Sequence, residues 1–184
     1  HMWTPDVYEG SPTSVTAFFA VAPKIAALGL IVRILITAMP TLIEDWQPIL
    51  IVLSIFSMLL GAFSAIGQQN LKRLLAYSSI SHMGFALMGV INGSFEGVRS
   101  LSLYLLIYLV MSLALFICII ALKTNDEHIE NINDISGLAK VNPVMAMIIS
   151  IILFSLAGIP PLAGFFAKFY VLYAAVEAEL YYLA

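Results

Sequence analysis

Long runs of apolar residues that carry few charges dominate this chain of 184 residues. A helix needs about 20 residues, at a rise of 1.5 Å each, to cross a hydrocarbon core roughly 30 Å thick. Stretches of this kind occupy residues 13–36, 48–66, 72–91, 100–122 and 143–182. The sequence therefore predicts an all-α fold, a polytopic transmembrane helix bundle with about five crossings.

The composition fits a chain whose main solvent is lipid. Apolar residues make up 61% of the chain and charged residues 10%, against roughly 45–50% and 25% in soluble domains. A domain this short cannot hide such an excess in its core, so a soluble globular protein is excluded. Because the net charge is −3 and the basic residues are scattered, we expect no nucleic-acid partner. Cys118 lies in an apolar run, and we expect neither thiol chemistry nor a metal site there.

The last apolar stretch is too long for one straight span, and Gly158-Ile159-Pro160-Pro161 interrupts it. Proline lacks an N–H, and the residue before it avoids the α region, so we expect a helix broken at Gly158–Pro161. Irregular backbone at membrane depth is tolerated only where it is buried in protein or lines a hydrated cavity. The break is therefore either part of a transport site or a hinge that fits a kinked helix into its bundle.

Lys24 is the most unusual residue of the first crossing. It lies about 16 Å along the crossing, close to the midplane of the bilayer, where a lysine costs roughly 2.5–3.5 kcal/mol to insert. A lysine in a medium of low dielectric holds its proton less tightly than in water, so small changes in hydration can switch its charge. We expect a proton relay here. The alternative is a permanent ion pair with an acidic residue on a neighbouring helix.

Further polar groups extend this candidate site. Lys168 follows the proline pair by seven residues, within reach of freed carbonyl groups and the water that they attract. On the third crossing Lys72, Ser79 and His82 lie within about 80° of one face, where they could pass protons along the membrane plane. Alternatively, His82 is an interhelical hydrogen-bond group and Lys72 an interfacial anchor. The neighbouring side chains expected to point elsewhere are Tyr77, Ser78 and Ser81.

The polar segments suggest how the chain is organised. Residues 123–142 form an extended stretch of alternating charges, which we expect to be an extramembrane loop in a single membrane domain covering residues 1–184. Basic residues in the short connections favour the cytoplasm for the side that holds residues 1–12, the turn near Lys72 and this loop. The chain starts at His1 and ends in apolar residues, so we expect a piece of a longer membrane protein.

Three runs are then informative together: HMWTPDVYEGSPTSVTAFFAVAPK, QQNLKRLLAYSSISHMG and SLAGIPPLAGFFAKFYVL. Their order and spacing resemble the antiporter-like proton-translocating membrane subunits of respiratory complex I, an NADH-quinone oxidoreductase. The resemblance covers essentially the whole chain, and the pairing of WTPDVYEG with GIPPLAGFFAKFYV is its most specific part. It implies that His1-Met2 is native sequence. It also implies a C-terminal-half fragment of a bundle of two inverted repeats, with the proline break in the second repeat.

The resemblance also implies a function and a set of partners. It implies proton translocation across the bacterial inner (plasma) membrane, in an enzyme whose redox chemistry resides in other subunits. Lys24 matches the family's central-axis lysine, Lys168 the lysine on the second broken helix, and Lys72 and His82 the polar stripe between them. The implied partners are the other membrane subunits of complex I, the lipid bilayer, protons and internal water. No flavin, iron–sulfur cluster, NADH or quinone is expected to bind to the chain itself.

Two other functions stay open on the residues alone. One is a subunit of a multisubunit cation/proton antiporter, which sodium-dependent transport without NADH oxidation would favour. The other is a non-pumping structural membrane subunit, in which the lysines are fixed ion pairs.

Overall fold

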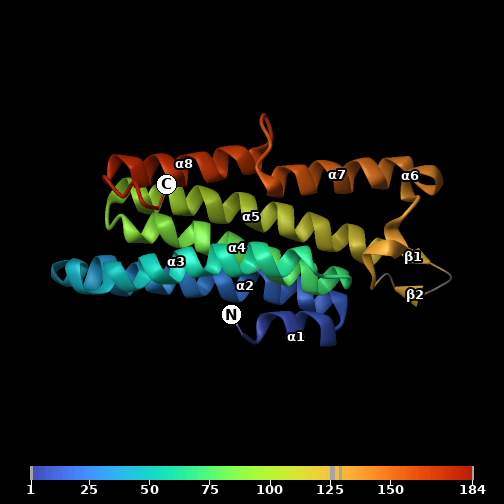
Figure 1. The fold of residues 1–184 in the computed structure, drawn as a ribbon, viewed down its shortest axis with the longest axis horizontal. Coiled ribbons are helices and arrows are strands. Elements are labelled where there is room, and N and C mark those ends of the chain that lie inside the picture. Colours follow the sequence, from blue (N-terminus) through green and yellow to red (C-terminus); the bar gives the residue numbers. More distant parts are fainter. Residues whose placement is uncertain (1, 125–126, 129, 184) are drawn as a thin grey trace.

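The computed structural model describes residues 2–124, 127–128 and 130–183, and Figure 1 shows them as a bundle of helices aligned with one long axis. Within this described part, four helical segments are long and apolar enough to cross a membrane. They are Thr13–Ala38, Pro40–Ile66, Leu71–Ile91 and Phe95–Ala121. A shorter apolar helix, α7 (Pro143–Ala157), follows them. The prediction of an all-α transmembrane bundle is therefore confirmed.

The first part of the chain forms the helices α1 (Thr4–Gly10), α2 (Thr13–Val32), α3 (Ile43–Ile66), α4 (Leu71–Ile91) and α5 (Phe95–Ala121). A π-helical segment (Arg33–Ala38) and a short 3-10 helix (Pro40–Leu42) connect α2 to α3. Two helices begin earlier than their predicted crossings at residues 48 and 100. Acidic residues in the first turn of α3 favour its earlier start, and the Ser94 side chain accepts a hydrogen bond from the Gly97 N–H at the start of α5.

Helix α4 is the central element of the bundle. It packs against α1, α2, α3, α5 and α8 (Ala163–Glu177), and most of its residues are buried. Small residues allow α3 and α4 to approach closely. A Cβ atom added at Gly61 would lie 2.6 Å from the Ser81 backbone nitrogen, and one added at Gly84 would lie 2.9 Å from the Ser54 carbonyl oxygen. Close packing through small residues is typical of membrane helices, and here it fixes the face of α4 that meets the other helices.

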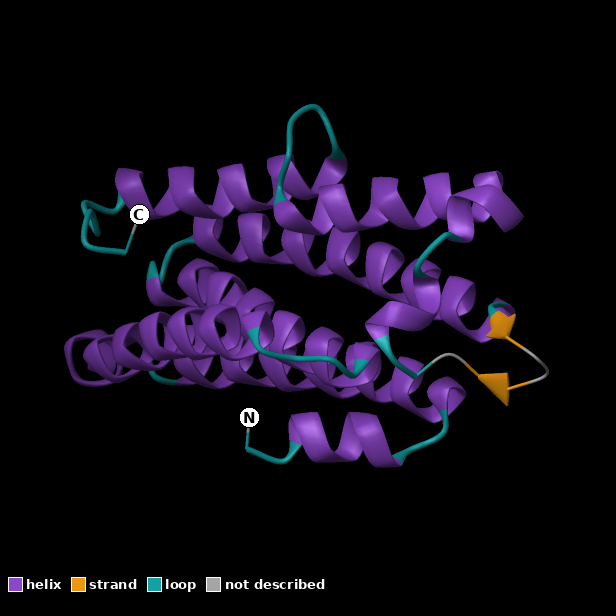
Figure 2. Ribbon diagram, turned by 45° about the vertical axis from the view of Figure 1, so that its right-hand side comes forward, coloured by secondary structure: helices purple, strands orange, loops and turns teal. Residues whose placement is uncertain are grey.

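The connection after α5 is a polar segment at one end of the bundle (Figure 2). It contains the paired two-residue strands β1 (Lys123–Thr124) and β2 (Glu127–His128), a 3-10 helix (Ile132–Ile135) and the short helix α6 (Leu138–Val141). Its backbone pairs with the start of α4, through Leu71 N–H to the Glu130 carbonyl at 2.8 Å and Ile132 N–H to the Gln69 carbonyl at 2.9 Å. Residues 125–126 and 129 of the predicted loop, and His1, lie outside the described residues.

The predicted break in the last apolar stretch is confirmed. Helices α7 and α8 lie end to end along one side of the bundle, and residues 158–162 project outward between them in both views (Figures 1 and 2). Each half has 15 residues, about 22 Å, and is too short to cross a membrane alone. Gly158 ends α7 with a φ of 91°, a left-handed value that favours glycine. The Ser155 hydroxyl then accepts a hydrogen bond of 3.0 Å from the Gly164 N–H, which ties the two halves together.

Candidate functional site

Lys24 on α2 reaches side chains from three other helices. Its amine donates hydrogen bonds of 2.7 Å to the Tyr8 hydroxyl of α1 and 2.7 Å to the Ser79 hydroxyl of α4, and it lies 3.5 Å from the Tyr108 hydroxyl of α5. None of the carboxylates in the described part of the chain forms an ion pair with this amine. Within these residues, neutral hydroxyl groups therefore hold the lysine, in place of the acidic partner that the structural alternative requires.

Aromatic rings complete the surroundings of the Lys24 amine. The nitrogen lies 5.2 Å from the ring centroid of Tyr8 and 5.8 Å from that of Tyr108, distances at which a ring face attracts a cation. Tyr8 is completely buried, and this burial raises the pKa of its phenol, so Tyr8 is neutral at physiological pH. The site can thus accommodate the charged amine with dipoles and rings, without a fixed opposite charge.

His82 on α4 is buried beside two tyrosines of α5. Its Nδ1 atom lies 2.7 Å from the Tyr104 hydroxyl, and its ring centroid lies 5.4 Å from that of Tyr108. Tyr108 also faces the Lys24 amine, so this one side chain lies next to both titratable groups. The structure therefore brings Lys24 and His82 into one polar cluster.

Lys168 on α8 folds back across the break between α7 and α8. Its amine donates a hydrogen bond of 3.1 Å to the carbonyl oxygen of Ala157, the last residue of α7. The amine also lies 5.0 Å from the ring centroid of Phe85 on α4. The end of a helix presents free carbonyl groups and a partial negative charge, both of which favour a cation. The contact with a carbonyl freed by the break agrees with the sequence-based expectation.

Two cavities lie beside these groups. The smaller one, of about 20 Å³, is lined by the three hydroxyl partners of Lys24 and by His82. A cavity of roughly 10–15 Å³ is enough for one water molecule, so this space can hold one. The larger pocket, of about 300 Å³, is lined by His82 and Lys168 among others. His82 and Ser78 lie in the walls of both.

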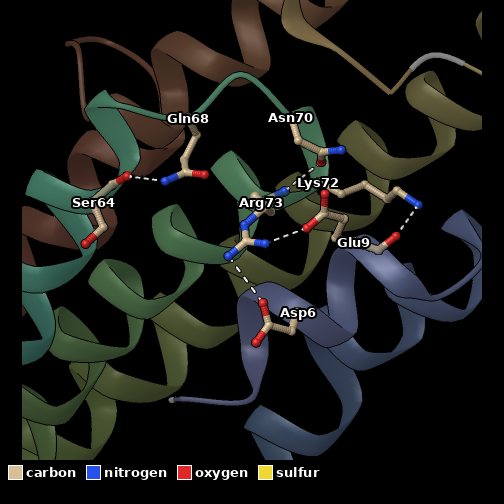
Figure 3. Close-up of polar contacts among 7 residues, drawn as sticks. All are labelled: Asp6, Glu9, Ser64, Gln68, Asn70, Lys72 and Arg73. Atoms are coloured by element: carbon tan, nitrogen blue, oxygen red, sulfur yellow. Dashed lines mark hydrogen bonds and ion pairs between the residues drawn. The ribbon is translucent and has the colours of Figure 1, made fainter.

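Lys72 lies apart from the cluster around Lys24 and His82. Its amine donates a hydrogen bond of 2.9 Å to the backbone carbonyl of Glu9, at the end of α1 (Figure 3). It donates another of 3.1 Å to the backbone carbonyl of Ser11. The sequence predicts one face that carries Lys72, Ser79 and His82. In the structure Ser79 and His82 belong to the cluster around Lys24, whereas Lys72 binds the end of α1. Lys72 thus holds the end of α1 and does not take part in the cluster around Lys24.

Several residues of the site were not found from the sequence. The sequence predicts that Tyr77, Ser78 and Ser81 lie off the face shared by Lys72, Ser79 and His82, whereas in the structure Ser78 and Ser81 line the larger pocket together with His82. The spacing of four between Ser78 and His82 places them on one face of a helix. Tyr8 was also missed. The tyrosines of α5 belong to a buried polar stripe at intervals of four, formed by Ser100, Tyr104, Tyr108 and Ser112.

Comparison with known sequences agrees with the motifs. The family model described as NADH:quinone oxidoreductase/Mrp antiporter, TM matches residues 1–184. NADH-quinone oxidoreductase subunit N 1 of Rhizobium meliloti (strain 1021) is 60% identical over 185 residues, which cover 100% of this chain and 38% of the relative. Subunit N of Pelagibacter ubique (strain HTCC1062) is 59% identical over 184 residues, which cover 100% and 39%. The chain therefore spans less than half the length of these relatives.

Solved structures show the same fold. A chain of respiratory complex I from Thermus thermophilus with bound aureothin matches with a TM-score of 0.80 and 34% identity, over 97% of this chain and 38% of that one. A chain of the Mrp complex from Dietzia sp. DQ12-45-1b matches with a TM-score of 0.89 and 30% identity, over 100% and 34%. The membrane-spanning helices and bacterial relatives show an integral protein of the bacterial inner membrane. The predicted resemblance is confirmed, and the chain belongs to the NADH:quinone oxidoreductase/Mrp antiporter transmembrane family.

Proposed function

We propose that this chain translocates protons across the bacterial inner membrane as part of an NADH:quinone oxidoreductase, respiratory complex I, and that Lys24, His82 and Lys168 carry the protons. The observation that supports this most is that two cavities share polar side chains in their walls. The cavity beside Lys24 and the pocket beside Lys168 share His82 and Ser78 in their walls. The redox chemistry belongs to other subunits, and this chain contributes the relay.

The proposed transfer uses only groups that gain and then lose one proton. The Lys24 ammonium releases a proton to a water molecule in the small cavity, and that water passes a proton to His82. His82 then passes a proton through water in the larger pocket to the neutral amine of Lys168. Moving one charge against a membrane potential costs about 2.3 kcal/mol per 100 mV, and changes in the proton affinity of the three groups must supply this work.

Lys72 has a supporting role in this proposal. Its amine already donates to two backbone carbonyls, so direct proton transfer from Lys72 to His82 would require it to leave both.

We assign the segment 123–142 to the outside of the membrane, within one membrane domain that covers the chain. The exposed apolar faces of the bundle would then contact lipid and the other membrane subunits of complex I. Large exposed side chains on α3 and α7 include Phe56, Phe63, Ile66, Ile151 and Phe154.

Replacement of Lys168 tests the proposal. In the complete subunit within the complete complex, Lys168→Met should reduce proton translocation by about an order of magnitude or more, because the last carrier is lost. Lys140→Met is the matched control, because Lys140 is exposed on α6, away from the cavities. Undiminished translocation by an assembled Lys168→Met complex would refute the proposed role.

The match to the Mrp complex, with a TM-score of 0.89, supports a second candidate, a cation/proton antiporter subunit. The higher identity of 60% to an NADH-quinone oxidoreductase subunit favours the first. Sodium-dependent proton exchange in vesicles without any NADH oxidation would decide for the antiporter.

A further inference from the structure

Helix α1 is too short to hold its own position. It has seven residues, and no side chain caps its N-terminus. Isolated helices of fewer than about 12 residues are marginal in water, so the placement of α1 depends on contacts with its neighbours. This placement matters because α1 carries Tyr8, whose hydroxyl accepts a hydrogen bond from the Lys24 amine.

Arg73, in the first turn of α4, forms ion pairs with two residues on the side of α1. The guanidinium of Arg73 lies 2.6 Å from a carboxylate oxygen of Glu9 and 3.2 Å from a carboxylate oxygen of Asp6 (Figure 3). Asp6 and Glu9 are three positions apart and therefore share a face of α1. Because the guanidinium fork has several donors in a rigid plane, it can bind both carboxylates at once.

A second basic side chain of α4 holds the end of α1. Lys72 donates to the carbonyls of Glu9 and Ser11, groups that are left without helical partners where α1 ends. The start of α4 is itself held in place, because the Asn70 side chain accepts a hydrogen bond of 3.1 Å from the Arg73 N–H. The Leu71 N–H, in the first turn of α4, also donates a hydrogen bond to the Glu130 carbonyl. The first turn of α4 is thus a fixed support for α1.

We propose that Arg73 is a positioning residue for the relay. Its ion pairs with Asp6 and Glu9 fix α1 against α4 and thereby hold the Tyr8 hydroxyl on the Lys24 amine. Hydrogen bonds from nitrogen to oxygen have lengths of about 2.7–3.2 Å, so a small displacement of α1 is enough to lose this contact of 2.7 Å. The inference rests on the proposed role of Lys24 in proton transfer.

A double-mutant cycle in the complete complex tests this inference. Tyr8→Phe removes only the hydroxyl and should lower proton translocation by about tenfold, because the Lys24 ammonium loses one hydrogen bond. Arg73→Gln removes both ion pairs, and because these are partly exposed it should lower translocation by a smaller factor, about two- to fivefold. If Arg73 acts through Tyr8, the double variant should be no worse than Tyr8→Phe alone. Arg73→Lys should restore part of the activity, because an ammonium group can replace one of the two ion pairs.

The pH profile of translocation separates positioning from general stabilisation. The ionisable groups that face or neighbour Lys24 are Tyr8 on α1, His82 on α4 and Tyr108 on α5. Loss of the Tyr8 acceptor leaves the Lys24 ammonium less well stabilised, so both single variants should move the alkaline limb of the profile to lower pH. Glu9→Gln, which removes only the shorter ion pair, should give a smaller shift in the same direction. It replaces Arg73→Gln in this measurement if the Arg73→Gln complex does not assemble.

The control is Arg99→Gln. Arg99 is an exposed arginine whose carboxylate partner, Glu96, lies 3.8 Å away on the same helix. This variant should change neither translocation nor its pH profile. Fully additive losses in the double variant, or an unchanged profile in Arg73→Gln, would overturn the positioning role. Lys24→Met is measured alongside: if it pumps normally, the proposed function itself has failed, whereas its inactivity together with additive losses would overturn only this inference.

Discussion

The Lys24 amine donates a hydrogen bond of 2.7 Å to the Ser79 hydroxyl, although 55 positions separate the two residues in the chain. The Ser79 hydroxyl in turn donates to the Ala76 carbonyl at 2.8 Å. This second bond directs a lone pair of the hydroxyl toward the amine. Helix α4 therefore supplies a fixed acceptor for the proposed central proton carrier.

Ser79→Ala should lower proton translocation by about tenfold, because the Lys24 ammonium loses a buried acceptor. Ser79→Thr keeps a hydroxyl at this position and should retain most of the activity. Ser102→Ala is the matched control, because the exposed Ser102 hydroxyl donates its hydrogen bond to the Val98 carbonyl of its own helix. Translocation rates of assembled complexes in proteoliposomes measure the effect, and equal rates for Ser79→Ala and Ser102→Ala would contradict it.

Tyr104→Phe should slow translocation by about tenfold while the complex still assembles. The phenyl ring keeps the apolar contacts of the buried side chain, but the hydroxyl that meets His82 Nδ1 at 2.7 Å is lost. Loss of one buried hydrogen bond costs about 1 kcal/mol of stability, which an assembled complex tolerates. Tyr173→Phe, at a half-exposed position of α8, is the control. The prediction fails if the two variants translocate protons equally fast.

Ser78 offers a test of the water connection, because it lines both cavities. Ser78→Val adds bulk and removes a polar partner for water, so it should reduce translocation severalfold, by about fivefold or more. Ser78→Ala leaves the space open and should have a smaller effect. If the alanine and valine variants translocate protons at the same rate, loss of the hydroxyl alone explains the effect. That result would count against a role for water in these cavities.

Gly164→Ala should disrupt the joint between α7 and α8. A Cβ atom at this position would collide with the carbonyl oxygen of Ser155, and backbone atoms cannot move aside without separating the half-helices. Overpacking of this kind costs about 1–3 kcal/mol or more. Gly29→Ala, on α2 with nothing within 4 Å of the added atom, should be neutral or stabilising. Thermal unfolding of the purified complexes compares the two, and equal stability would contradict the predicted collision.

The sequence predicts the crossings and the deep lysines well, because the bilayer itself constrains both. A span requires about 20 apolar residues, and a charge at the midplane is costly enough to stand out. The break after Gly158 is equally readable, since adjacent prolines cannot continue a helix. In each of these cases a local pattern carries the physical requirement.

Tyr8 could not be found in this way, because its role depends on how the chain folds. Along one continuous helix, 16 positions would separate Tyr8 from Lys24 by about 24 Å, yet the hydroxyl and the amine lie 2.7 Å apart. The extended residues Ser11 and Pro12 redirect the chain between α1 and α2 and bring the two together. The role of Lys72 similarly depends on where α1 ends, and no pattern within the third crossing reveals that.

The central claim is that the deep amines change protonation during turnover. Infrared difference spectroscopy of the complete complex with ¹⁵N-labelled lysine, between the resting and the NADH-driven state, measures this directly. We predict ammonium bands in the wild-type difference spectrum that weaken in Lys24→Met and in Lys168→Met. Identical difference spectra in all three complexes would mean that neither lysine titrates, and the relay would be contradicted.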